Sequence, residues 1–276
     1  MRVTTATAPG HAGRANEDFV GAVAHAAVLV DGAGIRDAEH LCRHGVAWYA
    51  HRLGGNLLAR LSLDGASRGA ATDLATIVAA AIDEVTWLHR DTCDVQDPSS
   101  PSATVAIVRV TADRVDHFLL GDSVVVLDRL DATPQVVEDR REVELGSPWR
   151  DALAPLEPGS AEFERVRGEA VTLFRASRNQ PGGFWVAKDD GQVAGEAIIG
   201  SHPVEELTSA VLLSNGASRV VDRFGLLEWH ELSSHHPEDL VRMVRAAERA
   251  GSVDPDDATA SICTDLTTGQ PPGPAG

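Results

Sequence analysis

Apolar residues recur at two different spacings along the chain, and the wider spacing predicts helices. Within residues 37–61 and again within residues 70–89, apolar side chains return every three or four positions, which places them on one face of a helix. The apolar positions are Leu41, Trp48, Leu53, Leu57 and Leu61 in the first segment, and Leu74, Ile77, Val78, Ala81, Ile82 and Val85 in the second. Further helices are expected over residues 160–178, 217–225 and 237–251.

Alternating or continuously apolar runs predict β-strands instead. These runs span residues 2–8, 18–24, 26–32, 103–110, 115–121, 123–129, 134–140, 208–216 and 256–266. Because short turns join the four runs between residues 103 and 140, we expect one antiparallel meander there. The glycine-rich segment 181–200 predicts a mobile flap with a short strand, in which Trp185 either contacts substrate or packs the flap down.

The order of these elements indicates the fold class. Two long helices stand between runs of strands, and the other helices come late, so the chain does not follow a regular βαβ repeat. We expect an α+β protein with mainly antiparallel strands, formed by residues 1–266 as a single domain. Residues 267–276, rich in Gly and Pro, are expected to be a disordered tail.

Composition narrows the class of protein. The chain has 276 residues, of which 43% are hydrophobic, enough for a substantial core. No run approaches the roughly 20 apolar residues of a membrane helix, and the N-terminus lacks the apolar region of a signal peptide. We therefore expect a cytoplasmic protein. Cys42, Cys93 and Cys263 are widely spaced with no CxxC pair, which favours buried thiols over a disulfide framework or a structural zinc site.

The charge balance excludes some partners. The chain carries 41 acidic and 24 basic residues, and its formal net charge of −17 argues against binding to nucleic acid or to an anionic membrane. The same balance permits divalent cations. Lys188 is the sole lysine, and together with abundant Ala and Gly this indicates a GC-rich bacterial genome.

Acidic residues gather where predicted strands meet turns: Glu17, Asp18, Asp31, Asp122, Asp256 and Asp257. For any one of them, aspartate before glycine is ordinary turn chemistry. Asp31 and Asp122, however, follow runs apolar enough to be core strands, where an unpaired carboxylate is costly. Lys and Arg are scarce around them, so a hard divalent cation such as Mg²⁺ or Mn²⁺, which prefers oxygen ligands, is a natural partner.

Five motifs, taken in order, carry a resemblance to a known family. They are RANEDF, VLVDGAG, SATVAIVRV with FLLGDS, VLLSNG and DDATASI. Their order and their strand or turn contexts resemble the metal-dependent type-2C serine/threonine protein phosphatases over about residues 3–266. The resemblance implies a four-layer α/β/β/α sandwich of two antiparallel sheets flanked by helices. It also implies two Mn²⁺ or Mg²⁺ ions at one end of the sandwich, with a weaker third in some members.

The resemblance also assigns roles to residues of this chain. It implies that Asp31 bridges both metal ions and that the Gly32 carbonyl helps to hold one of them. Glu17 is an implied ligand, directly or through Asp18 holding an ordered water, and Asp256 is an implied ligand of the other ion.

Three more positions have implied roles at the edge of this site. Asp122 matches a ligand of the weaker third ion, and Asn215 stands at a ligand position. Arg14, one residue closer to the acidic motif than in many relatives, matches the arginine that grips the substrate phosphate. Two cations close together lower the pKa of a shared water, and the hydroxide formed attacks the phosphorus in line.

The chain departs from the family pattern at three positions. Asn215 replaces the usual aspartate, and its amide oxygen brings no charge to a metal; loss of even an outer partner of a metal ligand typically costs about 10–100-fold in affinity. Asp257 stands where the family commonly has Asn, so one hypothesis is that it restores the lost charge. Adjacent residues of a strand point to opposite faces, which opposes that hypothesis. Ala33 replaces a histidine that some relatives use to protonate the leaving group.

Three functions remain open from the sequence. The first is a Mn²⁺- or Mg²⁺-dependent phosphatase acting on phosphoserine or phosphothreonine in proteins. The second is a pseudophosphatase that binds a phosphoprotein or another partner through a site weakened at Asn215. The third is a phosphatase for small molecules, because the catalytic core does not specify the substrate.

Overall fold

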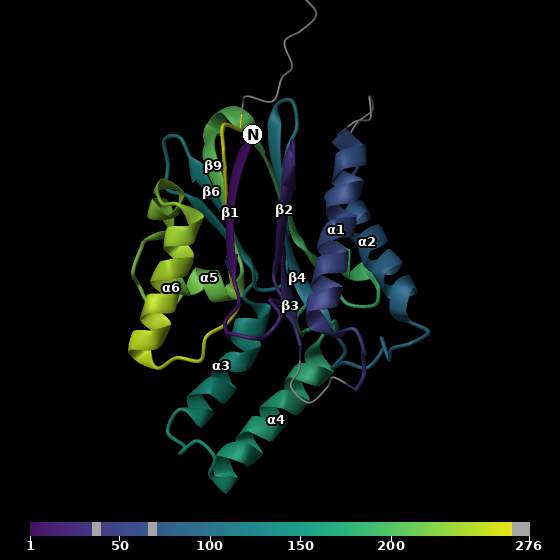
Figure 1. Cartoon of the computed structure of the whole chain (residues 1–276), viewed down its shortest axis with the longest axis vertical. Coiled ribbons are helices and arrows are strands. Elements are labelled where there is room, and N and C mark those ends of the chain that lie inside the picture. The colour runs from purple at the N-terminus through teal and green to yellow at the C-terminus, as the bar shows by residue number, and fades with distance from the viewer. Residues whose placement is uncertain (35–39, 66–70, 267–276) are drawn as a thin grey trace, which may run out of the picture.

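The chain folds into two antiparallel sheets stacked face to face, with helices on both outer faces (Figure 1). The structure is a computed structural model that describes residues 1–34, 40–65 and 71–266. Each sheet has five strands. The expected α+β class and the sandwich of two antiparallel sheets are confirmed, whereas the tail expected over residues 267–276 lies outside the described residues.

The strands follow the order β1-β10-β9-β6-β7 in the first sheet and β2-β3-β4-β5-β8 in the second. The first sheet contains β1 (Arg2–Ala8), β6 (Val124–Arg129), β7 (Gln135–Glu138), β9 (Leu207–Leu213) and β10 (Ala258–Thr264). The second contains β2 (Phe19–Val23), β3 (Ala26–Ala33), β4 (Ser102–Val110), β5 (Arg114–Leu120) and β8 (Ile198–Pro203).

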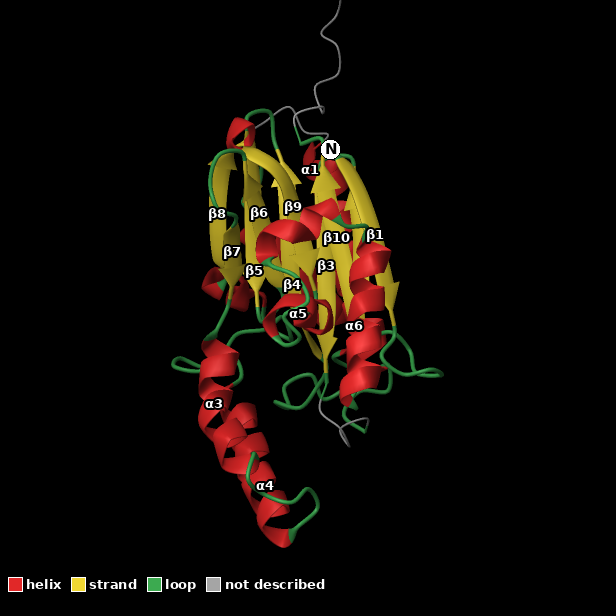
Figure 2. Cartoon of the chain, turned by 90° about the vertical axis from the view of Figure 1, so that its left-hand side faces the viewer, coloured by secondary structure: helices red, strands yellow, loops and turns green. Residues whose placement is uncertain are grey.

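The long helices form the two outer layers. The second sheet is covered by α1 (Gly45–Gly65) and α2 (Leu74–His89), and the first by α5 (Asn215–Asp222) and α6 (Pro237–Gly251). A helical hairpin of α3 (Arg141–Leu153) and α4 (Ala161–Ser177) extends beyond one end of the sheets (Figure 2). Short 3₁₀ helices are η1 (Gly191–Glu196), η2 (Val204–Glu206) and η3 (Trp229–Ser234).

The side-chain alternation of β3 shows how the layers share the core. Val28 and Val30 pack under α1 and α2, whereas Ala27 and Leu29 pack between the two sheets, and all four are fully buried. Since both faces of a central strand are buried, such a strand needs apolar residues at every position. This is why β3 and β4 are recognisable in the sequence as continuous apolar runs.

Both long helices begin later than their apolar spacing predicts. The first, α1, begins at Gly45, whose φ of +80° lies in the left-handed region that favours glycine and ends the preceding turn. The second, α2, begins at Leu74 because the Asp73 carboxylate caps it by accepting a hydrogen bond from the backbone N–H of Thr76. The parts of these predictions at residues 37–39 and 70 lie outside the described residues.

The predicted four-stranded meander is wrong at its third strand. Strands β4 and β5 pair in the second sheet, but β6 crosses to the first sheet, where it pairs with β7 and β9. The chain makes this crossing after a turn at Gly121, which has a φ of +88°. The crossing carries Asp122 into the space between the ends of the two sheets.

Residues 181–200, predicted to be a mobile flap with a short strand, instead pack against the second sheet, although the strand β8 does begin within them at Ile198. Ala187 pairs with Ala103 of β4, and Phe184 is buried. Trp185 packs against the core under α1 and α2, which agrees with the packing alternative for this residue. The segment is therefore a packed edge of the second sheet.

Candidate metal centre

The strand directions bring the predicted acidic segments to one end of the sandwich. Because neighbouring strands are antiparallel, β3, β5 and β9 all run toward this end, and β2 and β10 both start there. The hairpin of α3 and α4 extends from the same end (Figures 1 and 2). The residues that this end brings together are Glu17, Asp18, Asp31, Gly32, Asp122, Asn215, Asp256 and Asp257.

Asp31, near the end of β3, lies between the two sheets. Its Oδ2 accepts a hydrogen bond from the backbone N–H of Asn215 over 2.9 Å, which joins the second sheet to the first. Burial raises the pKa of the Asp31 carboxyl well above its usual range, and the nearby charges of Asp18 and Asp122 raise it further. The Asp31 carboxylate therefore lies where a nearby positive charge is needed to keep it ionised.

Asp122 and Asn215 are direct partners. The Asn215 side-chain Nδ2 donates a hydrogen bond to Asp122 Oδ2 over 2.8 Å. Burial, followed by the charge of Asp256, raises the pKa of Asp122 to about 6, although the Asn215 amide opposes this rise. The Asn215 amide thus stabilises the Asp122 carboxylate, as a bound cation would.

Asp18 is the most buried of the candidate ligands, with 3% of its surface exposed. Its Oδ2 accepts a hydrogen bond from the Thr259 hydroxyl over 2.6 Å. Its Oδ1 is buried and has no hydrogen-bond partner among the described residues. Burial raises the pKa of Asp18 to about 6. An orphaned carboxylate oxygen in this position fits a cation or a water that a cation holds.

Asp257 holds the backbone of the segment that carries Glu17. Its Oδ1 accepts from the N–H of Gly10 over 2.7 Å, and its Oδ2 accepts from the N–H of Glu17 over 2.5 Å. Burial and the charge of Asp257 raise the pKa of Glu17 to about 7. Gly32 donates its N–H to the Glu17 carbonyl over 3.1 Å, and a Cβ at Gly32 would lie 2.5 Å from that oxygen, so only glycine permits this approach.

Asp256 has a partner that the sequence did not suggest. Arg219, on α5, donates to Asp256 Oδ2 over 2.7 Å and to Glu248 over 3.0 Å. Arg245 also donates to Glu248, which is 2% exposed. The two arginines compensate the buried Glu248 carboxylate, and Arg219 fixes the position of Asp256.

A cleft of about 830 Å³ opens beside these acids. Arg14, Arg219 and Arg223 line it together with Glu17 and Asp256. Arg14 therefore lies beside the acidic cluster, where an anionic group could contact it. Arg219 and Arg223 were not predicted from the sequence. Their spacing of four residues could have indicated that both lie on the same face of a helix.

Glu142, at the start of α3, was also missed. Burial raises its pKa to about 8, with a further rise from the charge of Asp122. Its position follows from the packing of the α3–α4 hairpin at this end of the sheets, which no local pattern reveals.

The donor set fits hard divalent cations. Carboxylates from four separate segments lie at one end of the sandwich, and desolvation and mutual repulsion raise the pKa of Glu17, Asp18, Asp31 and Asp122. Burying such groups together without cations is unfavourable, and Mg²⁺ or Mn²⁺ takes this kind of oxygen ligand.

The family model of protein phosphatase 2C matches residues 9–248. The chain belongs to the protein phosphatase 2C family. A search of curated protein sequences finds no match to it.

Solved structures of bacterial phosphatases share this fold. The serine/threonine phosphatase PstP/Ppp of Mycobacterium tuberculosis is 17% identical, with a TM-score of 0.61 and coverage of 95% of this chain and 97% of that one. A structure of the PstP catalytic domain holds two manganese ions and is 15% identical, with a TM-score of 0.59 and coverage of 95% and 97%. Stp1 of Staphylococcus aureus is 13% identical, with a TM-score of 0.58 and coverage of 95% and 94%.

These solved structures establish that this chain has the sandwich fold of metal-dependent phosphatases. Among the described residues, none of the helices combines the length and the apolar character needed to cross a membrane.

Proposed function

We propose that this protein is a Mn²⁺- or Mg²⁺-dependent phosphatase that hydrolyses phosphoserine and phosphothreonine in proteins. The observation that carries the proposal is the convergence of carboxylates at one end of the sandwich, with Asp18 Oδ1 buried and unpartnered among the described residues. Binding proteins that lack metal-dependent activity have no need to retain a buried acidic cluster, because it destabilises the fold.

The residues that would hold the ions are those of the acidic cluster. Asp31 would contact both ions, with Glu17, Asp256 and the Gly32 carbonyl as further ligands and Asp18 acting through a water. Asp122 would be a ligand of a weaker third ion. The Asn215 side chain would stand at a further ligand position. Bound cations of this kind supply an activated water near neutral pH and offset the charge of the phosphoryl oxygens.

The chain's own groups bind and orient the phosphate ester. Arg14 lines the cleft beside Glu17, and a guanidinium there can form charge-assisted hydrogen bonds to phosphate oxygens. The backbone N–H of Asn215 holds Asp31 in place, and the Thr259 hydroxyl holds Asp18. Ala33 offers no acid to the leaving group, so water protonates it, and esters with leaving groups of lower pKa react faster.

The alternative function is that of a pseudophosphatase, and Asn215 is the observation that favours it. Its amide donates to Asp122 where a carboxylate would bring charge to the metal. In that case the cleft binds a phosphorylated partner without turnover.

The experiment compares phosphate release from phosphothreonine and phosphoserine peptides in saturating Mn²⁺. Asp31→Ala serves as the blank, and Asp131→Asn, an exposed aspartate after β6, serves as the matched control. We expect wild type and Asp131→Asn to release phosphate well above the Asp31→Ala background. If wild type binds the phosphopeptides, as measured by fluorescence anisotropy, but releases phosphate no faster than Asp31→Ala, the pseudophosphatase is favoured instead. Turnover of small phosphate esters without turnover of either peptide would point to a small-molecule phosphatase.

A further inference from the structure

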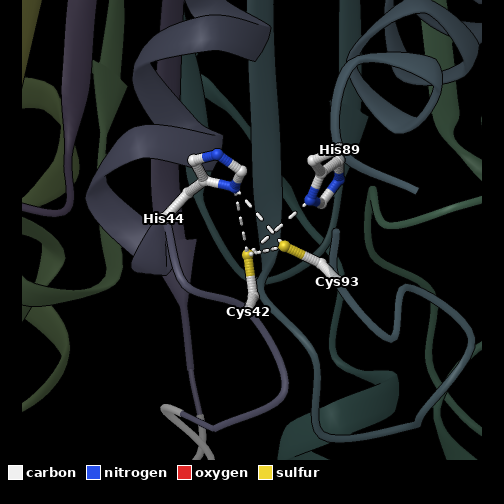
Figure 3. Close-up of side chains that lie close together, drawn as sticks. All are labelled: Cys42, His44, His89 and Cys93. Atoms are coloured by element: carbon white, nitrogen blue, oxygen red, sulfur yellow. Dashed lines mark hydrogen bonds between the residues drawn. The ribbon is translucent and has the colours of Figure 1, made fainter. Parts of the chain in front are cut away.

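Two cysteines and two histidines, none of them part of the acidic cluster, meet at the start of α1 and the end of α2 (Figure 3). They are Cys42, His44, His89 and Cys93. One possible ligand atom from each lies within 4.8 Å of the ligand atoms of the other three. The prediction of buried thiols is confirmed for Cys42 and Cys263, whereas Cys93 is only partly buried. The sulfurs of Cys42 and Cys93 are 3.1 Å apart.

We propose that Cys42, His44, His89 and Cys93 bind one zinc ion. Two thiolates and two imidazoles form one of the ligand sets of structural zinc sites, in which zinc is tetrahedral. With Zn–S bonds of about 2.3 Å and Zn–N bonds of about 2.0–2.1 Å, a tetrahedral site needs sulfur–nitrogen separations of about 3.6 Å and a sulfur–sulfur separation of about 3.8 Å.

The observed sulfur–nitrogen separations bracket the tetrahedral value of about 3.6 Å. Cys93 Sγ lies 3.4 Å from His44 Nδ1, and Cys42 Sγ lies 3.6 Å from His89 Nδ1 and 3.9 Å from His44 Nδ1. The sulfur–sulfur separation of 3.1 Å has to widen by about 0.7 Å to meet the tetrahedral value. The four side chains in Figure 3 turn their Sγ and Nδ1 atoms toward a common centre.

The fold fixes these ligands in two pairs. Cys42 and His44 precede α1, and the positive φ of Gly45 turns the chain from them into the helix. His89 ends α2, and its carbonyl accepts hydrogen bonds from both the N–H and the hydroxyl of Thr92 in the turn that carries Cys93.

A backbone hydrogen bond joins the two pairs. The N–H of Asp94 donates to the Leu41 carbonyl over 2.8 Å, so the residues next to Cys42 and Cys93 are held against each other. The backbone therefore holds the two pairs of ligands against each other.

The surroundings act on these groups in different directions: burial raises the pKa of the Cys42 thiol, which disfavours its thiolate, whereas His89 and Cys93 are shifted toward the forms that bind zinc. Burial lowers the pKa of His89, which keeps its imidazole neutral, the form that ligates zinc. Burial acts to raise the pKa of Cys93, but hydrogen bonds from Cys42, Thr92 and the backbone of Arg43 and His44 lower it overall.

Aromatic rings enclose the two histidines. Trp48 stacks on His44 with ring centroids 4.4 Å apart and lies 5.2 Å from the His89 ring. The fully buried Tyr49 lies 6.1 Å from the His89 ring and donates its hydroxyl to the Lys188 carbonyl over 2.7 Å. An apolar shell of this kind limits access of water to a zinc–thiolate site.

A Cys42–Cys93 disulfide is the competing use of these thiols. Its sulfurs would have to close to about 2.05 Å. That bond needs no imidazoles, whereas here both histidines direct a ring nitrogen at the sulfurs. A zinc ion accounts for the orientation of all four side chains. Because all four ligands come from the protein, the site would be structural and would hold the start of α1 to the end of α2.

The first test measures the metal content of protein purified under reducing conditions without chelator. We expect about one zinc per chain in wild type, in Cys263→Ser and in Asp31→Ala, and loss of that zinc in Cys42→Ser, Cys93→Ser and His89→Gln. Cys263→Ser is the matched control because its thiol is buried in a different part of the fold. Asp31→Ala separates this site from the acidic cluster.

The second test uses the wild-type protein and stands even if the cysteine variants fail to fold. X-ray absorption at the zinc edge should give two sulfur and two nitrogen neighbours. A chelator that removes the ion should lower the Tm and make Cys42 and Cys93 reactive toward a thiol reagent. Zinc surrounded by oxygen only, zinc lost in Asp31→Ala but kept in Cys42→Ser, absence of zinc, or a Cys42–Cys93 disulfide in reducing buffer would each overturn the proposal.

Discussion

The side-chain amide of Asn215 donates a hydrogen bond to the carboxylate of Asp122 over 2.8 Å, while its backbone N–H donates to Asp31 over 2.9 Å. One residue thereby joins the ends of three strands, β9, β5 and β3. An aspartate at position 215 would place a carboxylate where a donor now meets Asp122. The amide therefore stabilises the metal-free cluster, but it gives a bound metal ion no negative charge.

Replacing this amide by a carboxylate should destabilise the metal-free protein. In chelator at pH 8 we expect Asn215→Asp to lower the free energy of unfolding by about 1–3 kcal/mol, because the hydrogen bond becomes a contact between like charges. Chemical denaturation measures the loss. Asn215→Ala is the control that removes the bond without adding charge, so Asn215→Asp should be the less stable of the two. Equal stability of Asn215→Asp and wild type under these conditions would contradict the role given to the amide.

Asp257→Asn tests whether this aspartate holds the backbone or supplies charge to a metal. Both of its oxygens accept backbone N–H groups, so the variant turns an NH₂ toward a donor at Gly10 or Glu17. We expect a loss of about 1–3 kcal/mol in chelator, where no metal contributes. Asp113→Asn, an exposed aspartate in the β4–β5 turn, should change little. Lower Mn²⁺ affinity without any loss of stability in chelator would favour the hypothesis of restored charge.

Gly216→Ala should disrupt the contact between α5 and the start of β10. A Cβ at Gly216 would lie 2.0 Å from the Asp257 carbonyl oxygen, so the turn that carries Asp256 must move. We expect a loss of more than about 2 kcal/mol and weaker Mn²⁺ binding. Gly168→Ala is the matched control, because its added Cβ meets nothing within 4 Å inside α4 and should stabilise the helix by about 0.5–1 kcal/mol. Unchanged stability and Mn²⁺ binding in Gly216→Ala would contradict this close contact between α5 and the Asp257 carbonyl.

The stability of the metal-free protein should fall as pH rises from about 4 to 7. The pKa of Asp18 and of Asp122 is raised to about 6 and that of Glu17 to about 7, so the folded state holds more protons than the unfolded state in this window. The stability that these groups contribute is fully present below their pKa in the unfolded state, and it is lost as the pH rises through their pKa in the folded state. For Asp18 alone the loss is on the order of 3 kcal/mol.

Denaturation in chelator at several pH values measures this effect. Asp18→Asn should reduce the dependence of stability on pH, and comparing the variant with wild type cancels the titration of all other groups. Saturating Mn²⁺ should also reduce it by compensating the carboxylates. The same pH dependence in Asp18→Asn and wild type would contradict the raised pKa of Asp18.

Much of the fold can be predicted from the sequence, because central strands such as β3 need apolar side chains on both faces. Pairing partners cannot be predicted in the same way. Nothing in the local pattern of 123–129 says that β6 leaves its neighbour β5 for the other sheet. The helix α3 was not predicted because its one buried residue is Gly146 and it contains Pro148, so it lacks an apolar stripe.

The candidate sites show the same limit. Asp31, Asp122 and Asn215 can be found from sequence because each follows an apolar strand at a turn. Arg219 and Thr259 reach the cluster only through the packing of the first sheet. The cysteine–histidine cluster is hidden because its two pairs, one just before α1 and one at the end of α2, lie far apart in the sequence.

The most direct test of the metal centre is hydrolysis of p-nitrophenyl phosphate across a Mn²⁺ titration, for wild type, Asn215→Asp and the Asp31→Ala blank. We predict turnover by wild type only at high Mn²⁺, and a Mn²⁺ requirement about 10-fold or more lower in Asn215→Asp, because the new carboxylate adds charge at the metal. Wild type at the Asp31→Ala background at every Mn²⁺ concentration, with or without activity in Asn215→Asp, would contradict the claim that this protein is a working phosphatase.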